Sequence, residues 1–403
     1  MKSSASSFIV KEITGRGKVL EPGRMYSRAE LDEEEAAEGK FATFVLQKKD
    51  WNTVQVLVDM AKRLGRGKKS VGYAGTKDRT SVSVQLASIY GVEPERLLAL
   101  HMKDVSINGA WKSNGVEMGS NLGNAFDVVI ENARGIENAR ATVESLDGRF
   151  PNYFDRQRFG SRLNNAKIGL CIMRGDFEAA VLSILTDTSG ETNAGAVEAR
   201  KRLSEDLDFG AALSYFPRYL KNEFYVMHYL SEHGNDYAGA LRRMPRGISL
   251  MFIHAVQSLA FNLEVEDRVR RRDFDSLSGC RGNFYGFPDV DSVVDGPSDF
   301  PAAPLIGYET SDKHIGESGL RILDRLGVSK EAFRIKSMPE LSMKGSYRAL
   351  LAPFREFRME AREGGMALSF SIPSGAYATT LINEITKADD LDLNLLIPTD
   401  SNN

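Results

Sequence analysis

One carboxylate in this sequence stands between two cations in a short polar turn. Asp78 lies between Lys77 and Arg79 in the segment AGTKDRTS, which follows an apolar run and precedes a strand-like run. Flanking positive charges favour the ionised form of a carboxylate, and an ionised carboxylate that is held in place can act as a nucleophile or general base. An aspartate in a turn can also do no more than hydrogen-bond its own backbone. The pattern alone therefore leaves a catalytic and a structural interpretation of Asp78 open.

Strands and helices alternate irregularly on both sides of this turn. Apolar alternation and short apolar runs predict strands at residues 8–13, 41–47, 71–75, 81–92 and 125–130. Helical spacing of apolar residues predicts a helix after Asn52, which is suited to the N-cap position, and another over residues 136–146. This irregular order indicates an α+β fold with a mixed or antiparallel sheet, because a parallel sheet would show a regular β-α-β repeat.

The sequence pattern changes near Pro151. Residues 164–272 carry helical apolar spacing almost throughout. Residues 279–304 are rich in glycine, proline, aspartate and serine, which is typical of loops. Strand character returns at residues 366–372, and a helix is predicted to begin near Pro373. We therefore expect the two ends of the chain to form one α/β unit, with a helical insertion between them.

Length, composition and charge are those of a folded protein with room for two domains. The chain has 403 residues, of which 42% are hydrophobic and 27% are charged. Its net charge of −3 conceals basic clusters at Lys62–Lys69, Arg242–Arg246 and Arg268–Arg272, which acidic blocks offset in the sum. Such clusters suit a polyanionic partner, although solvated helix ends carry similar ones.

Residues that could hold a metal ion or anchor the chain in a membrane are sparse. Cys171 and Cys280 form no CxxC pair and the five histidines are scattered, so neither a structural zinc site nor a disulfide framework is predicted. The sequence has no run of 18 apolar residues and no signal-peptide core. The expectation is a protein of the reducing cytoplasm without a membrane segment.

Six further segments accompany the Asp78 turn in chain order. They are FIVKEI at 8–13 with Lys2 six residues before Phe8, Lys48 followed by Trp51-Asn52-Thr53, GNAF at 123–126, PNYFDRQRFG at 151–160, SLAFN at 258–262, and PSGAYAT at 373–379. Together with AGTKDRTS, these segments resemble sequence elements of the TruD family of pseudouridine synthases. The length of the chain between the two outer parts resembles the archaeal branch. Asp155 is a departure, because the family usually has a small residue there.

The resemblance implies the isomerisation of uridine to pseudouridine in tRNA, at position 13. Asp78 would be the catalytic residue, acting on the sugar or on the uracil. The implied fold is a pseudouridine-synthase catalytic domain at residues 1–147 and 352–403, with a mixed, largely antiparallel sheet, plus a mainly helical insertion domain at residues 148–351. No cofactor, metal, membrane or protein partner is implied. The main alternative is a catalytically inactive RNA-binding or chaperone protein of the same fold, and a hydrolase with Asp78 as base is a weaker one.

The resemblance also implies residues that bind the target base, which must leave the base stack to be reached. Phe8 or Tyr377 would stack on the flipped uracil. Phe126 would line the pocket, and Asn124 would hydrogen-bond the uracil edge. From the pattern alone, Phe8 and Phe126 fit the core of a sheet, and Asn124 after a glycine fits a turn.

Further polar residues are predicted to support the site or to contact RNA. The supporting residues are Lys2, Glu12, Lys48, Lys77 and Arg79, and the RNA-contacting residues are Arg156, Arg158, Arg268 and Arg271. Lys2, Lys77 and Arg79 are the cations that could keep Asp78 ionised, and Glu12 could orient Lys2 or another cation. The aromatic residues at 153–159 are expected to be buried in a hinge, which leaves one arginine of that segment for RNA.

Overall fold

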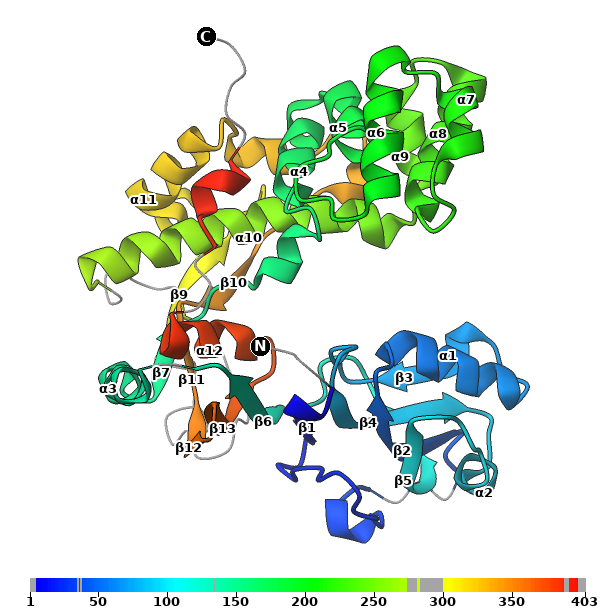
Figure 1. Cartoon of the computed structure of the whole chain (residues 1–403), viewed down its shortest axis with the longest axis vertical. Coiled ribbons are helices and arrows are strands. Elements are labelled where there is room, and N and C mark those ends of the chain that lie inside the picture. The colour runs from blue at the N-terminus through cyan, green and yellow to red at the C-terminus, as the bar shows by residue number, and fades with distance from the viewer. Residues whose placement is uncertain are drawn as a thin grey trace. The chain divides into compact units, whose positions relative to one another are not determined.

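The chain folds into two units (Figure 1). The computed structural model describes residues 5–34, 36, 38–133, 135–273, 281–282, 300–387 and 391–397. Lys2 and Cys280 therefore lie outside the described residues. The first unit comprises the described residues up to Phe150 together with Ala352–Lys387. The second unit comprises those from Pro151 to Gly282, Phe300–Leu351 and the described residues after Lys387.

A sheet that draws strands from both ends of the chain forms the first unit. Its spatial order within the described residues is β12 (Arg355–Arg362), β13 (Gly365–Pro373), β6 (Gly123–Glu131), β1 (Phe8–Ile13), β4 (Val82–Tyr90), β2 (Phe41–Lys49) and β5 (Val105–Ser113), with β3 (Val71–Tyr73) paired to β4. Strands β1 and β4 are parallel, and the other pairs of this sheet are antiparallel. The predicted mixed, largely antiparallel sheet is confirmed.

Helices cover this sheet. The helix predicted after Asn52 begins there, whereas the helix predicted to begin near Pro373 starts only at Ala378, because Pro373 ends a strand. The α-helices of the first unit, among the described residues, are α1 (Thr53–Arg63), α2 (Pro94–Leu98), α3 (Ile136–Leu146) and α12 (Ala378–Thr386). The side chain of Asn52 caps α1 by accepting a hydrogen bond from the Gln55 amide at 3.1 Å. Leu57 and Met60, one turn apart on α1, are buried against Phe44 and its neighbours in the sheet.

Strands β5 and β12 are not predicted by the sequence pattern. In β5 the alternation is broken, because Gly109 has a φ of 123° and the register with β2 shifts near Phe44 and Leu46. Strand β12 lies at the edge of the sheet, where most of its side chains are exposed; its apolar alternation is limited to Phe357, Met359 and Ala361 between charged residues, and Phe357 stacks on Phe370 of β13. The loop predicted for 279–304 is wrong at its end, because residues 300–305 form a strand of the second unit.

The second unit is mainly helical, as predicted. Its α-helices in the described part of the chain are α4 (Asn165–Arg174), α5 (Phe177–Leu185), α6 (Ala194–Asp206), α7 (Phe209–Tyr215), α8 (Lys221–His233), α9 (Tyr237–Arg243), α10 (Arg246–Arg271) and α11 (Asp312–Arg325). Its strands are β8 (Arg281–Gly282), β9 (Phe300–Leu305) and β10 (Ser346–Ala349). A separate pair, β7 (Arg149–Pro151) with β11 (Leu351–Pro353), lies where the chain passes from one unit to the other. Leu393 and Leu396 also pack into the helical core, although residues 352–403 as a whole were expected in the first domain.

Helix α10 is the central helix of the second unit, and α4 packs along it (Figure 1). By length and composition alone α10 could cross a membrane, although it contains no run of 18 apolar residues. However, 78% of its most apolar window is buried inside the unit. This burial is that of the core helix of a folded domain.

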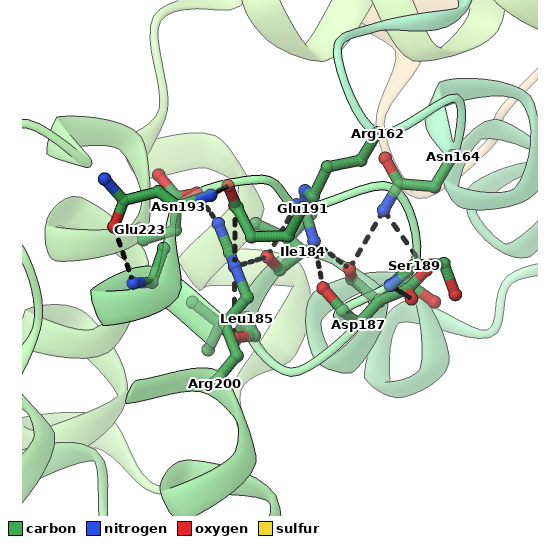
Figure 2. A network of polar contacts seen from close by, with 12 residues as sticks. Arg162, Asn164, Ile184, Leu185, Asp187, Ser189, Glu191, Asn193, Arg200 and Glu223 are labelled. Atoms are coloured by element: carbon green, nitrogen blue, oxygen red, sulfur yellow. Dashed lines mark hydrogen bonds and ion pairs between the residues drawn. The ribbon is translucent and has the colours of Figure 1, made fainter. Parts of the chain in front are cut away.

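A buried arginine joins three elements of the second unit (Figure 2). Arg200 of α6 donates to the main-chain oxygens of Ile184 at 2.6 Å and Leu185 at 3.1 Å, at the C-terminal end of α5. Its guanidinium also pairs with Glu223 of α8 at 2.7 Å and with Glu191 at 3.5 Å. Arg200 thereby satisfies carbonyl groups that the end of a helix leaves without partners and ties α5, α6 and α8 together.

Candidate active site

Side chains from several elements hold the turn that carries Asp78. Thr53, the first residue of α1, accepts a hydrogen bond from the Lys77 amide at 3.0 Å. Gln85 of β4 donates to the main-chain oxygen of Gly75 at 3.1 Å and accepts from the Thr53 hydroxyl at 3.1 Å. Ser81 donates to the main-chain oxygen of Asp78 at 2.8 Å. The backbone on both sides of the carboxylate is therefore fixed, as a reacting group requires.

Lys77 belongs to the buried support of this turn. Its ammonium Nζ lies 2.6 Å from Glu12 Oε2, and both side chains are buried. The other oxygen of Glu12 accepts a hydrogen bond from the Leu86 amide of β4 at 2.9 Å. Glu12 thus orients Lys77. The sequence left open which cation keeps Asp78 ionised, and Lys77 was one of the three candidates. By contrast, Arg79 is exposed and Asp78 is half-buried, so the turn presents these two residues near the surface.

Lys48 supports the same turn. This residue of β2 is fully buried, and its Nζ donates to the main-chain oxygen of Asp78 at 2.9 Å. Burial lowers the pKa of Lys48 to about 8, although the negative charge of Asp78 acts in the opposite direction. A buried cation therefore lies directly beneath the residue predicted to be catalytic.

One face of the sheet carries Glu12 and three of the residues predicted to bind the base or line its pocket. Phe8 and Glu12 share a face of β1, because side chains alternate along a strand. Asn124 pairs directly with Glu12, and Phe126 pairs with Val10, so both β6 side chains lie on that same face. The rings of Phe8 and Phe126 are 5.9 Å apart, and the two residues are only 1% and 7% exposed. These aromatic residues have the packing of a sheet core, and their contact with a base stays a prediction.

Asn124 has an unpaired polar atom. Among the described residues, its side-chain oxygen Oδ1 is buried and has no hydrogen-bond partner. Buried polar atoms of folded proteins are nearly always paired. An acceptor of this kind, on the same sheet face as Glu12, suits a ligand that donates an N–H group.

The segment of Tyr377 begins beside Asn124. The last two residues of β13, Ile372 and Pro373, pair with Asn124 and Gly123. The following residue, Ser374, donates its amide to Leu122 at 2.9 Å. Tyr377 then stands, partly exposed, at the N-terminus of α12. The structure therefore brings the GNAF and PSGAYAT segments together.

The two arginines of the PNYFDRQRFG segment lie in the second unit. Phe154 and Phe159 of that segment are buried, as expected, whereas Tyr153 is partly exposed. Asn262 of α10 donates to the Phe154 carbonyl at 3.0 Å and accepts from the Phe154 amide at 2.8 Å, which links this segment to SLAFN. The guanidinium of Arg158 lies 5.1 Å from the centre of the Phe154 ring, and Arg156 is exposed. Their contact with RNA stays a prediction.

Arg268 and Arg271 sit in ion pairs near the end of α10. Arg268 is buried and bonds to Glu264 at 2.8 Å, one turn earlier in the helix, and to Asp273 at 3.1 Å. Arg271 bonds to Asp267 at 3.1 Å, also one turn earlier. Much of the positive charge that the sequence shows in this cluster is therefore matched by carboxylates of the same helix.

Three supporting residues of the turn were not predicted: Thr53, Ser81 and Gln85. The signal for Gln85 is a long polar side chain inside the apolar strand SVSVQLAS, where a buried amide needs a partner. In the part of the chain that the structure describes, no group of three histidine, cysteine, aspartate or glutamate side chains could hold a metal ion.

Comparisons with known proteins give one consistent result. The family model of tRNA pseudouridine synthase D (TruD) matches residues 1–279 and 287–385. A "Probable tRNA pseudouridine synthase D" of Methanopyrus kandleri is 34% identical, over 91% of this chain and 90% of that protein. The protein of the same name from Methanococcoides burtonii is 31% identical, over 89% and 90%. The crystal structure of a "Putative tRNA pseudouridine synthase D (TruD)" from Methanosarcina mazei superposes with a TM-score of 0.72 at 28% identity, over 96% of this chain and 93% of that one.

Proposed function

The chain belongs to the TruD family of tRNA pseudouridine synthases, and we propose on this premise that it isomerises uridine to pseudouridine in tRNA, at position 13. The reaction breaks the N1–C1′ bond, turns the uracil and forms a C5–C1′ bond. A proton leaves C5 and another is taken up at N1, so the product is an isomer of the substrate. The reaction needs no oxidant, reductant or phosphate donor.

The observation that carries this proposal is the support of the Asp78 turn. Lys48 and Ser81 both donate to the Asp78 carbonyl, while Thr53 and the Glu12–Lys77 pair fix the residue before it. Such support limits the positions available to the Asp78 carboxylate, so that it can attack the sugar or the uracil without first being ordered.

Asn124 is the proposed reader of the uracil edge. Uracil presents one N–H donor between two carbonyl acceptors, and an asparagine side chain offers an acceptor and two donors. The buried Oδ1 of Asn124 would accept from the uracil N–H and so gain its missing partner. Tyr377, four residues beyond the end of the strand that pairs with Asn124, is proposed to stack on the flipped base.

The two units take different parts in the proposal. The catalytic domain is proposed at residues 1–147 and 352–387, and it contains Asp78, Asn124 and Tyr377. The insertion domain is proposed at residues 148–351 and would contact the folded RNA. Arg156 and Arg158 are its proposed RNA-contacting residues, because they stand next to partly exposed Tyr153 in a segment anchored by Asn262.

The test is Asp78→Asn. We expect this change to abolish pseudouridine formation in a tRNA transcript, because asparagine keeps the size of the side chain but cannot act as nucleophile or base. RNA affinity and the circular dichroism spectrum should be unchanged. The matched control is Asp104→Asn, at an exposed turn aspartate with a φ of 59°, a conformation that asparagine tolerates.

Two outcomes would contradict the proposal. Near-normal turnover by Asp78→Asn would remove Asp78 from the chemistry. If the wild type bound tRNA but formed no pseudouridine, the inactive RNA-binding alternative would replace the enzyme. A transcript with cytidine at position 13 tests the target, and product formed elsewhere in that transcript would contradict position 13.

A further inference from the structure

A surface of the first unit carries five exposed cations close together in the sequence. Its members are Lys62, Arg63, Arg66, Lys68 and Lys69, and we call it the 62–69 surface. The sequence has no aspartate or glutamate from Met60 to Lys77. Local positive charge of this density creates a potential that attracts polyanions.

Local contacts hold part of this surface in place. Helix α1 ends at Arg63, and a 3₁₀ turn over Lys68–Ser70 follows. The guanidinium of Arg66 donates to the main-chain oxygen of Gly91, just after β4. The Ser70 hydroxyl donates to the Gly67 carbonyl at 2.7 Å. The cations therefore stand on a connection tied to both the helix and the sheet.

The charges of this surface are not matched by carboxylates. Within the described residues, Lys62, Arg63, Lys68 and Lys69 have no ion pair, whereas Lys18 and Lys112 of the same unit pair with Asp32 at 2.9 Å and with Glu93 at 2.7 Å. Attraction to the negative C-terminal end of the helix dipole can explain the positions of only two of these cations, Lys62 and Arg63 in the last turn of α1. It does not account for Lys68 and Lys69, which lie beyond the end of the helix.

We propose that the 62–69 surface binds the phosphate backbone of the RNA substrate, outside the site that takes the target uridine. This inference rests on the proposed function. Strand β3 leads from this surface to the Asp78 turn, and the nine residues from Lys69 to Asp78 span at most about 30 Å when extended. About one turn of a nucleic-acid duplex covers that distance, so one RNA can reach both places. Phosphate contacts of this kind set the position of an RNA without reading its sequence.

The test compares two pairs of lysines in the full-length protein. Lys68→Gln/Lys69→Gln removes two unpaired charges, and the matched control Lys18→Gln/Lys112→Gln removes two paired ones. The affinity for a tRNA transcript is measured between 50 and 200 mM salt. With about 0.7 counterions released per phosphate contact, the first variant should have a log–log salt slope shallower by about 1.4, and the wild type should lose about sevenfold more affinity over this range. The control should keep the wild-type slope.

A graded variant and a measurement of chemistry complete the test. Adding Lys62→Gln and Arg63→Gln should make the slope shallower by about 2.8, which is about a fiftyfold difference over the same range. At saturating enzyme and low salt, single-turnover pseudouridine formation should stay within about threefold of wild type, because these residues hold the RNA and not the base.

The outcomes for the surface and for the proposed function are separable. The role of the 62–69 surface would be overturned, even if the enzyme is active, by either of two results. One is a wild-type salt slope in the twofold and fourfold variants of this surface, and the other is an equally large change of slope in the Lys18/Lys112 control. A wild type that binds tRNA with these slopes but forms no pseudouridine would overturn the proposed function and leave the surface assignment intact. The melting temperatures of all variants should match the wild type, because the altered side chains are solvent-accessible.

Discussion

Lys48→Met separates stability from activity in the candidate active site. Methionine keeps an unbranched apolar stem but lacks the ammonium that donates to the Asp78 carbonyl. The folded protein holds Lys48 with a pKa of about 8 instead of the ordinary lysine value of 10.5. A shift of this size means that the charged form costs the folded state about 3 kcal/mol at neutral pH. The hydrogen bond to the Asp78 carbonyl, which the neutral amine would also donate, offsets about 0.5–1.5 kcal/mol of this.

We therefore expect the variant to be at least as stable as the wild type at pH 7, with a gain of up to about 2 kcal/mol. Activity should nevertheless fall by about a hundredfold, because the Asp78 turn loses the donor that fixes its carbonyl. Such a loss would identify Lys48 as a positioning residue that acts through Asp78.

The pH dependence of stability provides the sharper measurement. Because the folded-state pKa of Lys48 is lowered, the unfolded chain binds more protons between pH 8 and 10.5, and the free energy of unfolding rises with pH across this window. From pH 7 to 10 the wild type should gain roughly 2–3 kcal/mol relative to Lys48→Met. Other groups titrate in both proteins and cancel in the difference.

The assay is urea unfolding followed by tryptophan fluorescence at both pH values. Both tryptophans of the sequence, Trp51 and Trp111, lie in the first unit and so report the unfolding of the unit that contains Lys48. A variant that loses more than about 1 kcal/mol at pH 7, or that shows no difference in pH dependence, would refute this account of Lys48.

Three other changes give distinct expected results. Glu12→Gln leaves the buried Lys77 ammonium without its counter-charge and should destabilise the first unit by about 3–5 kcal/mol, measured by tryptophan fluorescence. A destabilisation below about 1 kcal/mol would show that the Glu12–Lys77 pair does not support the Asp78 turn. Arg200→Met should destabilise the second unit by a similar amount in circular dichroism and leave the tryptophan transition in place, and a shift of both transitions together would contradict this. A chelator should leave pseudouridine formation on a pre-folded transcript unchanged, and loss of turnover with retained binding would require a metal-dependent mechanism.

Local patterns predicted those parts of the fold that depend on neighbouring residues. The strand at 8–13 follows from its alternation, and the start of α1 follows from Asn52, because a strand face and a helix cap are both set within a few residues. The mixed sheet followed from the irregular order of these elements. The strand at residues 300–305 was missed, because its prolines favour a loop in local statistics.

The contacts that build the candidate site join residues far apart in the sequence, and no local pattern encodes them. Lys77 meets Glu12, and Asn262 meets both backbone groups of Phe154, only because the fold brings their elements together. Glu12 and Asn124 were found through motif resemblance, but their direct pairing across β1 and β6 required the register of the sheet. The unpaired oxygen of Asn124 likewise appears only when its surroundings are known.

The pairing of β13 with β6 also sets the order in which the protein can mature during translation. Strand β6 is complete at Glu131, but its partner begins only at Gly365, so at 5–20 residues per second the ribosome needs roughly 10–50 s to supply it. Most of the second unit emerges in that interval and can fold first. Until β13 arrives, β6 has an open edge of the kind that recruits other chains. A nascent chain that stops before Gly365 is therefore expected to aggregate and not to persist as a shorter enzyme.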